Sequence, residues 1–348
     1  MTRYLAHIAT FCALYLLIKK EDILNTKIIK FGFLLGLMLL WTSFSQAATA
    51  YITNQGENSV SVIDTQTQQV IKKITVGAAP VGVAVSPQLH RAYISNVDGQ
   101  SISIIDTQNL SLIDTVKVPG SPVGMITSPD GQTLYIADWT DDLIYLLNTS
   151  TLRIENKIQA GKAPAGMELS PDGAKLYVAN RDSDDIAIID TQTRNISKRI
   201  KVGKHPFGLA ISQNGNQLYV VNVVSNSVSI INTNDLSSFT IKVGEHPYCV
   251  SPSKDGQLLY VTNTQDDSVS VINLSAKKVI AEIKVGQVPE GINVDSKSGN
   301  VYVANWGSGE VTIIDDNTHK VIQQIKTGDK SRAFGEFMMP DEASHDAK

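Results

Sequence analysis

Tyr260-Val261-Thr262-Asn263 decides the fold, because the chain repeats this four-residue pattern seven times. Each copy holds a Tyr, a β-branched residue, a small or β-branched residue, and then Asn or Asp. The other copies lie at 51–54, 93–96, 135–138, 177–180, 219–222 and 302–305. Successive Tyr residues stand 42, 42, 42, 42, 41 and 42 residues apart. A period of this length is typical of proteins built from repeated supersecondary units.

Each period predicts four short strands. In the fourth repeat we expect strands at 164–169, 175–180, 186–190 and 196–202. Turn residues such as Ser170-Pro171-Asp172-Gly173 separate them, with Pro fixing φ and Gly supplying positive φ. Short β-branched runs between turns are typical of all-β proteins, and no segment has a sustained helical period.

The repeats predict an all-β fold, a single seven-bladed β-propeller with four antiparallel strands in each blade. The propeller is expected to span 51–339. Because the chain enters the array at the second-strand motif of Tyr51, blade one lacks its first strand. Residues 331–339 match the first-strand segments of the other blades, so we expect them to pair with 51–54 and close the ring. The polar tail at 340–348 is expected to be disordered.

The residues before the array predict export. An apolar run at 31–41 follows Lys27 and Lys30 and precedes small residues ending at Ala47, which is typical of a secretory signal peptide at 1–47 cleaved after Ala47. The run is shorter than the ~20 residues of a membrane span, although an uncleaved anchor is the alternative. Residues 1–26 are interpreted as a start codon placed too early or a long basic region. We therefore expect a periplasmic or secreted monomer, not embedded in a membrane after cleavage.

Charge and cysteine content narrow the function. Residues 1–47 hold five of the 30 Lys and Arg and two of the 34 Asp and Glu, so the remainder has a net charge of −7. This balance argues against nucleic acid as a partner, because polyanions are bound by cationic surfaces. Cys249 is the single cysteine after residue 47, which excludes an internal disulfide there, and no C-x-x-C-H haem motif is present.

The repeats resemble the YVTN-type β-propeller family. The resemblance rests on Tyr260-Val261-Thr262-Asn263, on Ser59-Val60-Ser61-Val62-Ile63-Asp64-Thr65 and on Val202-Gly203-Lys204-His205-Pro206-Phe207-Gly208. It implies a lactonase-like seven-bladed propeller. The functions implied are those of surface-layer proteins, of periplasmic binding or accessory proteins in redox pathways, and of lactonase-like enzymes.

Candidate functional residues are those that depart from the repeat average. The loops that enter the first strands and the loops that join second to third strands are expected on one face, which we call the top face. The position after the Pro of the Val-Gly-x-x-Pro segment reads Val81, Val123, Ala165, Phe207, Tyr248, Glu290 and Arg332 around the ring. Just before that Pro, blades five and six carry His205 and His246. These departures predict an arc at the channel mouth: His205, Phe207, His246, Tyr248, Glu290 and Arg332.

The arc has two interpretations. It could bind a small polar ligand or a side chain of a partner, with Arg332 holding a carboxylate in a bidentate manner. Alternatively, Glu290 pairs with Arg332 and the aromatic rings plug the channel. His205 and His246 are weak metal candidates, because a metal site needs three or four ligands and no third His or Cys aligns with them. No cofactor is clearly implied.

A second column of departures follows the Tyr motif. Trp139 and Trp306, the two tryptophans after residue 47, both stand there, as does Arg181. Trp and Arg are favoured anchors of interfaces, although each Trp could instead pack as a lid on its neighbouring blade. Asp182, Asp184 and Asp185 in the same loops disfavour nucleic acid and weakly suggest Ca²⁺, but acidic loops are commonly turn formers.

The sequence therefore predicts an exported, non-catalytic binding or scaffold protein that uses its top face for a protein partner or small ligand. The alternative is a lactonase-like or cofactor-assisted enzyme, working with a metal or quinone at the channel mouth. A single-stranded nucleic-acid binder is the third interpretation, which the loop aspartates oppose.

Overall fold

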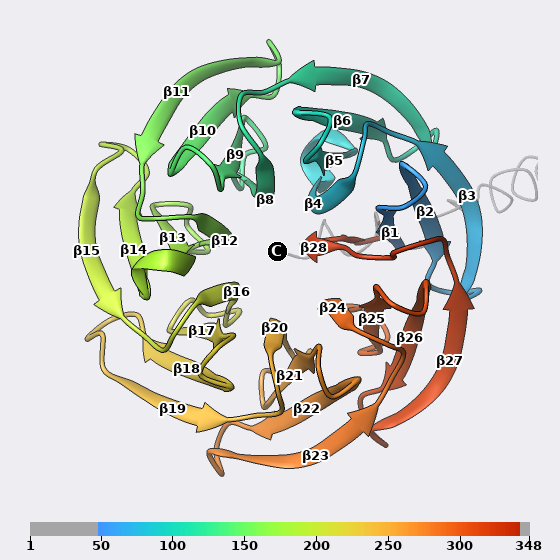
Figure 1. The fold of residues 1–348 in the computed structure, drawn as a ribbon, viewed down its shortest axis with the longest axis vertical. Helices are drawn as coiled ribbons and strands as arrows, with labels where there is room; N and C mark the ends of the chain where they lie inside the picture. The colour runs from blue at the N-terminus through green and yellow to red at the C-terminus, as the bar shows by residue number, and fades with distance from the viewer. Residues whose placement is uncertain (1–47, 342–348) are drawn as a thin grey trace, which may run out of the picture. The chain divides into compact units, whose positions relative to one another are not determined.

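The computed structural model describes residues 48–341. The predicted signal peptide, the interpretation of residues 1–26 and most of the predicted tail lie outside the described residues. Seven small sheets stand around a common centre and form the blades of a propeller (Figure 1). The predicted all-β seven-bladed propeller is confirmed. Helical structure within residues 48–341 is confined to two 3₁₀ turns, η1 (Pro87–Leu89) and η2 (Arg181–Ser183).

Each blade has four antiparallel strands, which follow one another from the channel outward. Blade one holds β29 (Met338–Met339), β1 (Thr49–Asn54), β2 (Ser59–Asp64) and β3 (Gln69–Thr75). Blade two holds β4 (Pro80–Ser86), β5 (Arg91–Asn96), β6 (Ser101–Asp106) and β7 (Ser111–Lys117), with β28 (Phe334–Gly335) added parallel to β4. Blade three holds β8 (Pro122–Thr127), β9 (Thr133–Asp138), β10 (Leu143–Asn148) and β11 (Arg153–Gln159).

The remaining blades follow the same order. Blade four holds β12 (Pro164–Leu169), β13 (Lys175–Asn180), β14 (Asp185–Asp190) and β15 (Ile196–Lys201). Blade five holds β16 (Pro206–Ile211), β17 (Gln217–Asn222), β18 (Ser227–Asn232) and β19 (Ser238–Lys242). Blade six holds β20 (Pro247–Pro252), β21 (Leu258–Asn263), β22 (Ser268–Asn273) and β23 (Lys278–Lys284). Blade seven holds β24 (Pro289–Val294), β25 (Val301–Asn305), β26 (Glu310–Asp315) and β27 (Lys320–Lys326).

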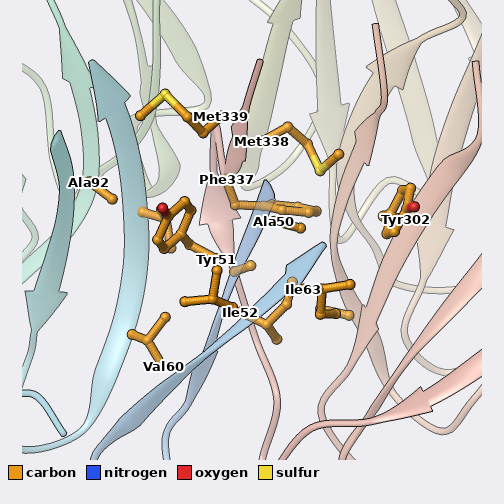
Figure 2. Close-up of a cluster of buried hydrophobic side chains, with 14 of the residues drawn as sticks. Ala50, Tyr51, Ile52, Val60, Ile63, Ala92, Tyr302, Phe337, Met338 and Met339 are labelled. Atoms are coloured by element: carbon orange, nitrogen blue, oxygen red, sulfur yellow. The ribbon is translucent and has the colours of Figure 1, made fainter. Parts of the chain in front are cut away.

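The Tyr of the repeated motif packs between blades. Six of the seven copies are among the largest fully buried side chains, at positions 51, 93, 177, 219, 260 and 302. Tyr302 of blade seven belongs to the same hydrophobic cluster as Ile52 and Val60 of blade one (Figure 2). Burial of each such ring stabilises the contact between neighbouring blades by about 1.5–3 kcal/mol.

The Gly of the Pro-x-Gly segment allows neighbouring inner strands to approach closely. A Cβ atom on Gly124 would lie 2.0 Å from the carbonyl oxygen of Ala165 in the next blade. The same position on Gly208 would put a Cβ atom 2.5 Å from the carbonyl oxygen of Tyr248. A side chain at these positions would collide with backbone, so the glycines set the spacing of the ring.

The Asn of the motif ties the end of the second strand to its surroundings. In blade five, the Asn222 side-chain amide donates to the hydroxyls of Ser227 at 3.3 Å and Ser229 at 2.9 Å. Its side-chain oxygen accepts the backbone N–H of Gly203 at 3.0 Å. Asn54 and Asn263 donate to the equivalent serines. The motif therefore ends in a buried polar connector.

Replacing this connector is expected to destabilise the ring. Asn222→Ala should lower the free energy of unfolding by about 1–3 kcal/mol, because it leaves buried donors and acceptors without partners. Asn232→Ala is the matched control, since Asn232 caps a turn by accepting the backbone N–H of Asn234 at 2.9 Å. Denaturant unfolding of both variants measures the difference, and equal losses would contradict the connector role.

The C-terminal segment closes the ring, as predicted. Ser331 bridges to Asn54, the Arg332 backbone N–H donates to the Thr53 carbonyl at 2.7 Å, and Tyr51 donates to the Phe337 carbonyl at 2.9 Å. β29 then pairs with β1 at positions 49 and 50, just beyond the expected 51–54. Phe337, Met338 and Met339 pack into the blade-one cluster (Figure 2). Asp341 is also buried and pairs with Lys297 at 2.8 Å, so the packed segment extends past residue 339.

The closing strand departs from the other inner strands by two extra residues. In blade four, Pro164 pairs with Asn180 and Leu169 pairs with Leu176, five residues later. In blade one, Ser331 pairs with Asn54 but the equivalent of Leu169 is Met338, seven residues later. The surplus is taken up by Phe334–Gly335 (β28), which leaves the blade-one sheet and runs beside β4 toward the centre of the ring (Figure 1).

Candidate functional site

The two loop types of the predicted top face lie together in the structure. The residue after the Tyr motif donates its backbone N–H to the carbonyl oxygen of the residue just before the Pro of the inner strand in the same blade, or its equivalent. Trp139 donates in this way to Ser121, Arg181 to Ala163, and Trp306 to Val288. Gln55 donates in the same way to Lys330. These bonds bring both columns of departures to one face around the channel mouth.

Arg332 and Glu290 form a buried ion pair at this mouth. The Arg332 Nε donates to a Glu290 carboxylate oxygen, and the two side chains are only 16% and 12% exposed. Arg332 also donates through Nη2 to the Tyr248 hydroxyl at 2.9 Å and through Nη1 to the Gln55 side-chain oxygen at 3.5 Å. Burial raises the pKa of Glu290, although the neighbouring guanidinium opposes that shift.

Aromatic rings fill the channel beside this pair. The Phe207 ring lies 4.4 Å from that of Tyr248 and 4.8 Å from that of Phe334, centroid to centroid. Trp139 meets Phe207 edge to face at 5.8 Å. Phe207 and Phe334 are almost fully buried. For Phe207, Tyr248, Glu290 and Arg332, the structure thus matches the arrangement in which the charges pair and the rings plug the channel.

The two tryptophans stand at the ends of this network. The Arg181 guanidinium lies 5.1 Å from the centroid of the Trp139 ring, and the Lys330 ammonium lies 5.4 Å from that of Trp306. Trp306 donates its indole N–H to the Gln55 oxygen at 3.1 Å, the same oxygen that faces Arg332. Both indoles are partly exposed. One series of contacts therefore crosses the mouth: Arg181, Trp139, Phe207, Tyr248, Arg332, Gln55, Trp306 and Lys330.

The structure brings together seven of the nine residues expected from the sequence and adds Gln55, Lys330 and Phe334. Gln55 occupies the same column as the tryptophans, and Lys330 the same column as the histidines. Both residues are polar at positions where several other blades carry apolar residues, and this difference could have identified them from the sequence. Phe334 carries no such signal, because the two-residue insertion shifts it out of register.

His205 and His246 lie outside this series of contacts. Both adopt positive φ, as Ala79, Ala163, Val288 and Lys330 do at the same position, and their backbone N–H groups donate to Asp184 and Asn226. The His246 Nδ1 is 3.2 Å from the Thr264 hydroxyl. Residues 48–341 contain no group of three or more His, Cys, Asp or Glu side chains able to hold a metal ion.

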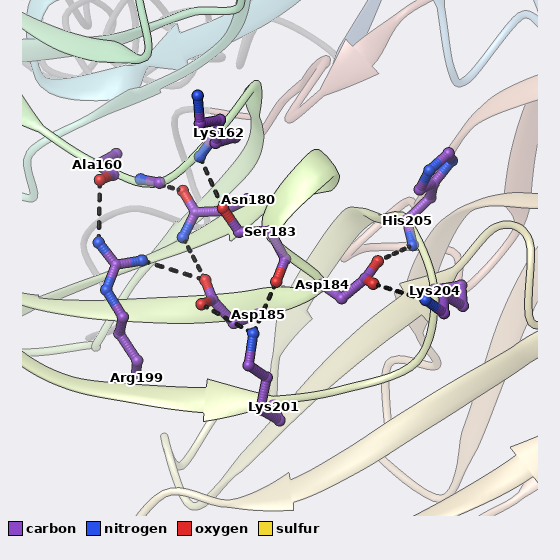
Figure 3. A network of polar contacts seen from close by, with 11 residues as sticks. Ala160, Lys162, Asn180, Ser183, Asp184, Asp185, Arg199, Lys201, Lys204 and His205 are labelled. Carbon is purple, nitrogen blue, oxygen red and sulfur yellow. Dashed lines mark hydrogen bonds and ion pairs between the residues drawn. The ribbon is translucent and has the colours of Figure 1, made fainter.

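The acidic loop of blade four is neutralised by cations. Asp185 pairs with Arg199 at 3.2 Å and with Lys201 at 3.6 Å (Figure 3). Asp184 pairs with Lys204 at 3.2 Å and accepts the His205 backbone N–H at 2.9 Å. These carboxylates serve the turn and its neighbours, which favours a turn-forming role over a Ca²⁺ site.

A cavity of about 540 Å³ lies in the channel below the aromatic plug. Its wall runs along the inner strands from the glycine column to the turns that carry Gln213, Lys254 and Ser296. Glu168 of β12 and Glu336, just after β28, line it together with Cys249. Burial raises the pKa of the Cys249 thiol, which keeps it protonated at neutral pH. Comparison between the repeats distinguishes Cys249 and Glu168, but it cannot place Glu336, which lies in the irregular closing segment.

Comparisons with known proteins agree with the fold. The family model "Lactonase, 7-bladed beta-propeller" matches residues 145–245, and the model "SMP-30/Gluconolactonase/LRE-like region" matches residues 248–335. The PE-PGRS family protein PE_PGRS18 of Mycobacterium tuberculosis (strain ATCC 25618 / H37Rv) is 62% identical over 37 residues. That stretch is 11% of this chain, and it spans only 8% of the length of that curated relative.

Solved propellers are similar at low sequence identity. Kuenenia stuttgartiensis hydrazine synthase has a TM-score of 0.70 at 22% identity, covering 77% of this chain and 92% of that one. A functionally unknown protein from Desulfotomaculum acetoxidans DSM 771 has a TM-score of 0.69 at 15% identity, covering 83% and 99%. Dihydro-heme d1 dehydrogenase NirN in complex with DHE has a TM-score of 0.62 at 17% identity, covering 80% and 63%. These likenesses show the fold alone.

Within residues 48–341, no helix has the length and apolar character needed to cross a bilayer.

Proposed function

We propose, from the premise that the chain belongs to the lactonase-like seven-bladed propellers, that it is an exported, non-catalytic binding protein using its top face. The observation that carries the proposal is the series of contacts from Trp139 to Trp306. It ends on each side in a partly exposed indole flanked by a cation. Trp and Arg are the residue types that dominate the energetics of protein interfaces.

The contacts among the side chains of the mouth support binding of a partner. The Arg332 guanidinium, the Glu290 carboxylate and the Tyr248 hydroxyl are already engaged with one another. Burial raises the pKa of Tyr248, so its hydroxyl remains protonated at neutral pH. The mouth therefore offers preorganised side chains for contact, and preorganisation lowers the entropic cost of association. A protein partner or a small ligand at the rim of the mouth would meet both indoles.

Truncating one indole is expected to weaken binding of a periplasmic partner. Trp306→Ala should cost about 2 kcal/mol or more, roughly thirtyfold in Kd, because hot-spot aromatics contribute on this scale. The partner would be captured on residues 48–348, purified, and titrated by calorimetry. Phe239→Ala is the matched control, since Lys277 stacks on Phe239 at 4.4 Å on the outer strand β19. Equal affinity for the Trp306 variant and the parent would contradict the proposal.

The second candidate is a lactonase-like or cofactor-assisted enzyme acting at the mouth. The descriptions of the two matching family models support it. Hydrolysis of sugar lactones by the purified protein, with and without divalent metal, tests it. Metal-dependent turnover that is lost in His205→Ala would favour the enzyme over the binding protein. His90→Ala is the control, because His90 follows the 3₁₀ turn η1 and lies outside the mouth contacts.

A further inference from the structure

The channel cavity has the dimensions of a small-molecule site. Its volume of about 540 Å³ lies within the ~300–1,000 Å³ usual for ligand pockets. Its wall consists of inner strands that the glycine column holds at fixed spacing, and Phe334 of the aromatic plug is also among its lining residues. Apart from Phe334, its lining residues lie outside the top-face contacts on which the proposed function rests.

In one ring of inner-strand positions that line this cavity, a single residue differs in charge from its equivalents in the other blades. In blades two to seven, the inner strand begins with Pro, and its fifth residue lines the cavity. These six residues are Ala84, Ile126, Glu168, Ala210, Ser251 and Asn293. Five of them are small, apolar or neutral, and Glu168 alone is charged. The second carboxyl, that of Glu336, directly follows the two surplus residues Phe334–Gly335 of the closing segment.

The two carboxyls lack a cationic partner. Within residues 48–341, no ion pair involves Glu168 or Glu336. The Glu168 carboxyl lies beside the backbone N–H of Leu169, and Glu336 accepts the backbone N–H of Met338 at 3.2 Å. Lys254, the one cation among the lining residues, donates instead to the Lys297 carbonyl at 2.8 Å. The Glu168 side chain is thus partly buried and lines the cavity without a cationic partner.

The electrostatics of this pair favour a cation. Enclosure by protein raises the pKa of Glu168 to about 8, and the neighbouring charge of Glu336 contributes to that shift. The surrounding protein also raises the pKa of Glu336 to about 7, although this side chain is exposed. The other titratable groups that line the cavity are Cys249 and Lys254. Near neutral pH the pair holds protons that a bound cation would displace, because opposite charge stabilises carboxylates.

We propose that the channel cavity binds a small organic cation, a protonated amine with an apolar body, and that Glu168 and Glu336 hold its ammonium group. The apolar wall supports this choice, since Met125, Met167, Leu209 and Ile292 line the cavity. An organic cation is favoured over a metal ion, because two carboxylates fall short of the ligand number that metal sites in proteins use.

Calorimetric titration with hexylamine, hexan-1-ol and hexanoate tests the proposal on the purified protein. Hexylamine is expected to bind with 1:1 stoichiometry and at least about tenfold more tightly than the isosteric alcohol, and hexanoate should not bind. At neutral pH its binding enthalpy should vary with the ionisation enthalpy of the buffer, because protons leave the carboxyl pair. Glu168→Gln and Glu336→Gln should each weaken hexylamine binding about tenfold or more.

Two controls separate the site from other effects. Glu155→Gln removes an exposed carboxylate of β11 and should leave amine binding unchanged. Trp306→Ala should also leave amine binding unchanged. The proposed cavity site and the proposed top-face site can therefore be refuted independently of each other. Equal affinities for amine and alcohol, or undiminished amine binding in a folded Glu168→Gln variant, would overturn the proposal. Thermal unfolding verifies the fold of each variant. If Glu336→Gln does not fold, amine binding by Glu168→Gln alone tests the proposal.

Discussion

Deletion of residues 331–348 is expected to open the ring and abolish the single cooperative unfolding transition. The deletion removes β29 and the buried side chains of Phe337, Met338 and Met339, each worth about 1.5–3 kcal/mol. It exposes the inner edge of β1, whose backbone groups at Tyr51 and Thr53 lose their partners. It also removes Arg332, which leaves the Glu290 carboxylate without its cationic partner. The summed loss is a large part of the 5–15 kcal/mol by which domains are stable.

A shorter deletion of residues 342–348 is the matched control. Both proteins lack the same seven terminal residues, so the difference between them isolates residues 331–341. Differential scanning calorimetry should show one transition for the shorter deletion and a broad or absent transition for the longer one. Size-exclusion chromatography should show association of the longer deletion, because an unpaired strand edge promotes aggregation. Full solubility and an unchanged melting temperature of that protein would refute the closure.

The fold could be predicted from the sequence because its determinants are local and occur many times. Each Tyr motif includes its own strand ends, its buried ring and its polar connector. Seven copies at a nearly constant period are compatible with one register for the sheets. Errors at a single boundary therefore average out over the repeats. The closing contact between Ser331 and Asn54 followed from the missing first strand of blade one.

The candidate site could be predicted only where it stays in register with the repeat. Phe207, Tyr248, Glu290 and Arg332 occupy one column, so comparison between blades places them together. Glu336 and Phe334 could not be placed in this way, because the insertion breaks the column between Ser331 and Met338. Whether Arg332 is free or paired also depends on side-chain geometry, which the spacing of residues does not determine.

The second large effect is expected from breaking the buried pair at the mouth. Arg332→Met should lower the free energy of unfolding by about 3–5 kcal/mol near neutral pH, because it leaves the Glu290 carboxylate buried without its cation. Arg332→Met combined with Glu290→Met should recover much of this loss, since apolar side chains of similar volume often replace a buried pair without penalty. Denaturant unfolding of the two single variants and the double variant completes the cycle.

The pH dependence of Arg332→Met gives a sharper test of the same pair. Burial already raises the pKa of Glu290, and loss of the guanidinium removes the attraction that opposes this shift. In the variant, the folded state therefore binds the Glu290 proton more tightly than the unfolded state does. Its stability should be greatest below the unfolded pKa of ~4.5 and should fall as the pH rises through the raised folded pKa. Unfolding measured at ~pH 5 and ~pH 8 should show the deficit growing with pH, and the doubly substituted protein should lose this trend. A deficit that does not change with pH would mean that Arg332 stabilises the mouth through packing and its bonds to Tyr248 and Gln55 instead of through its charge.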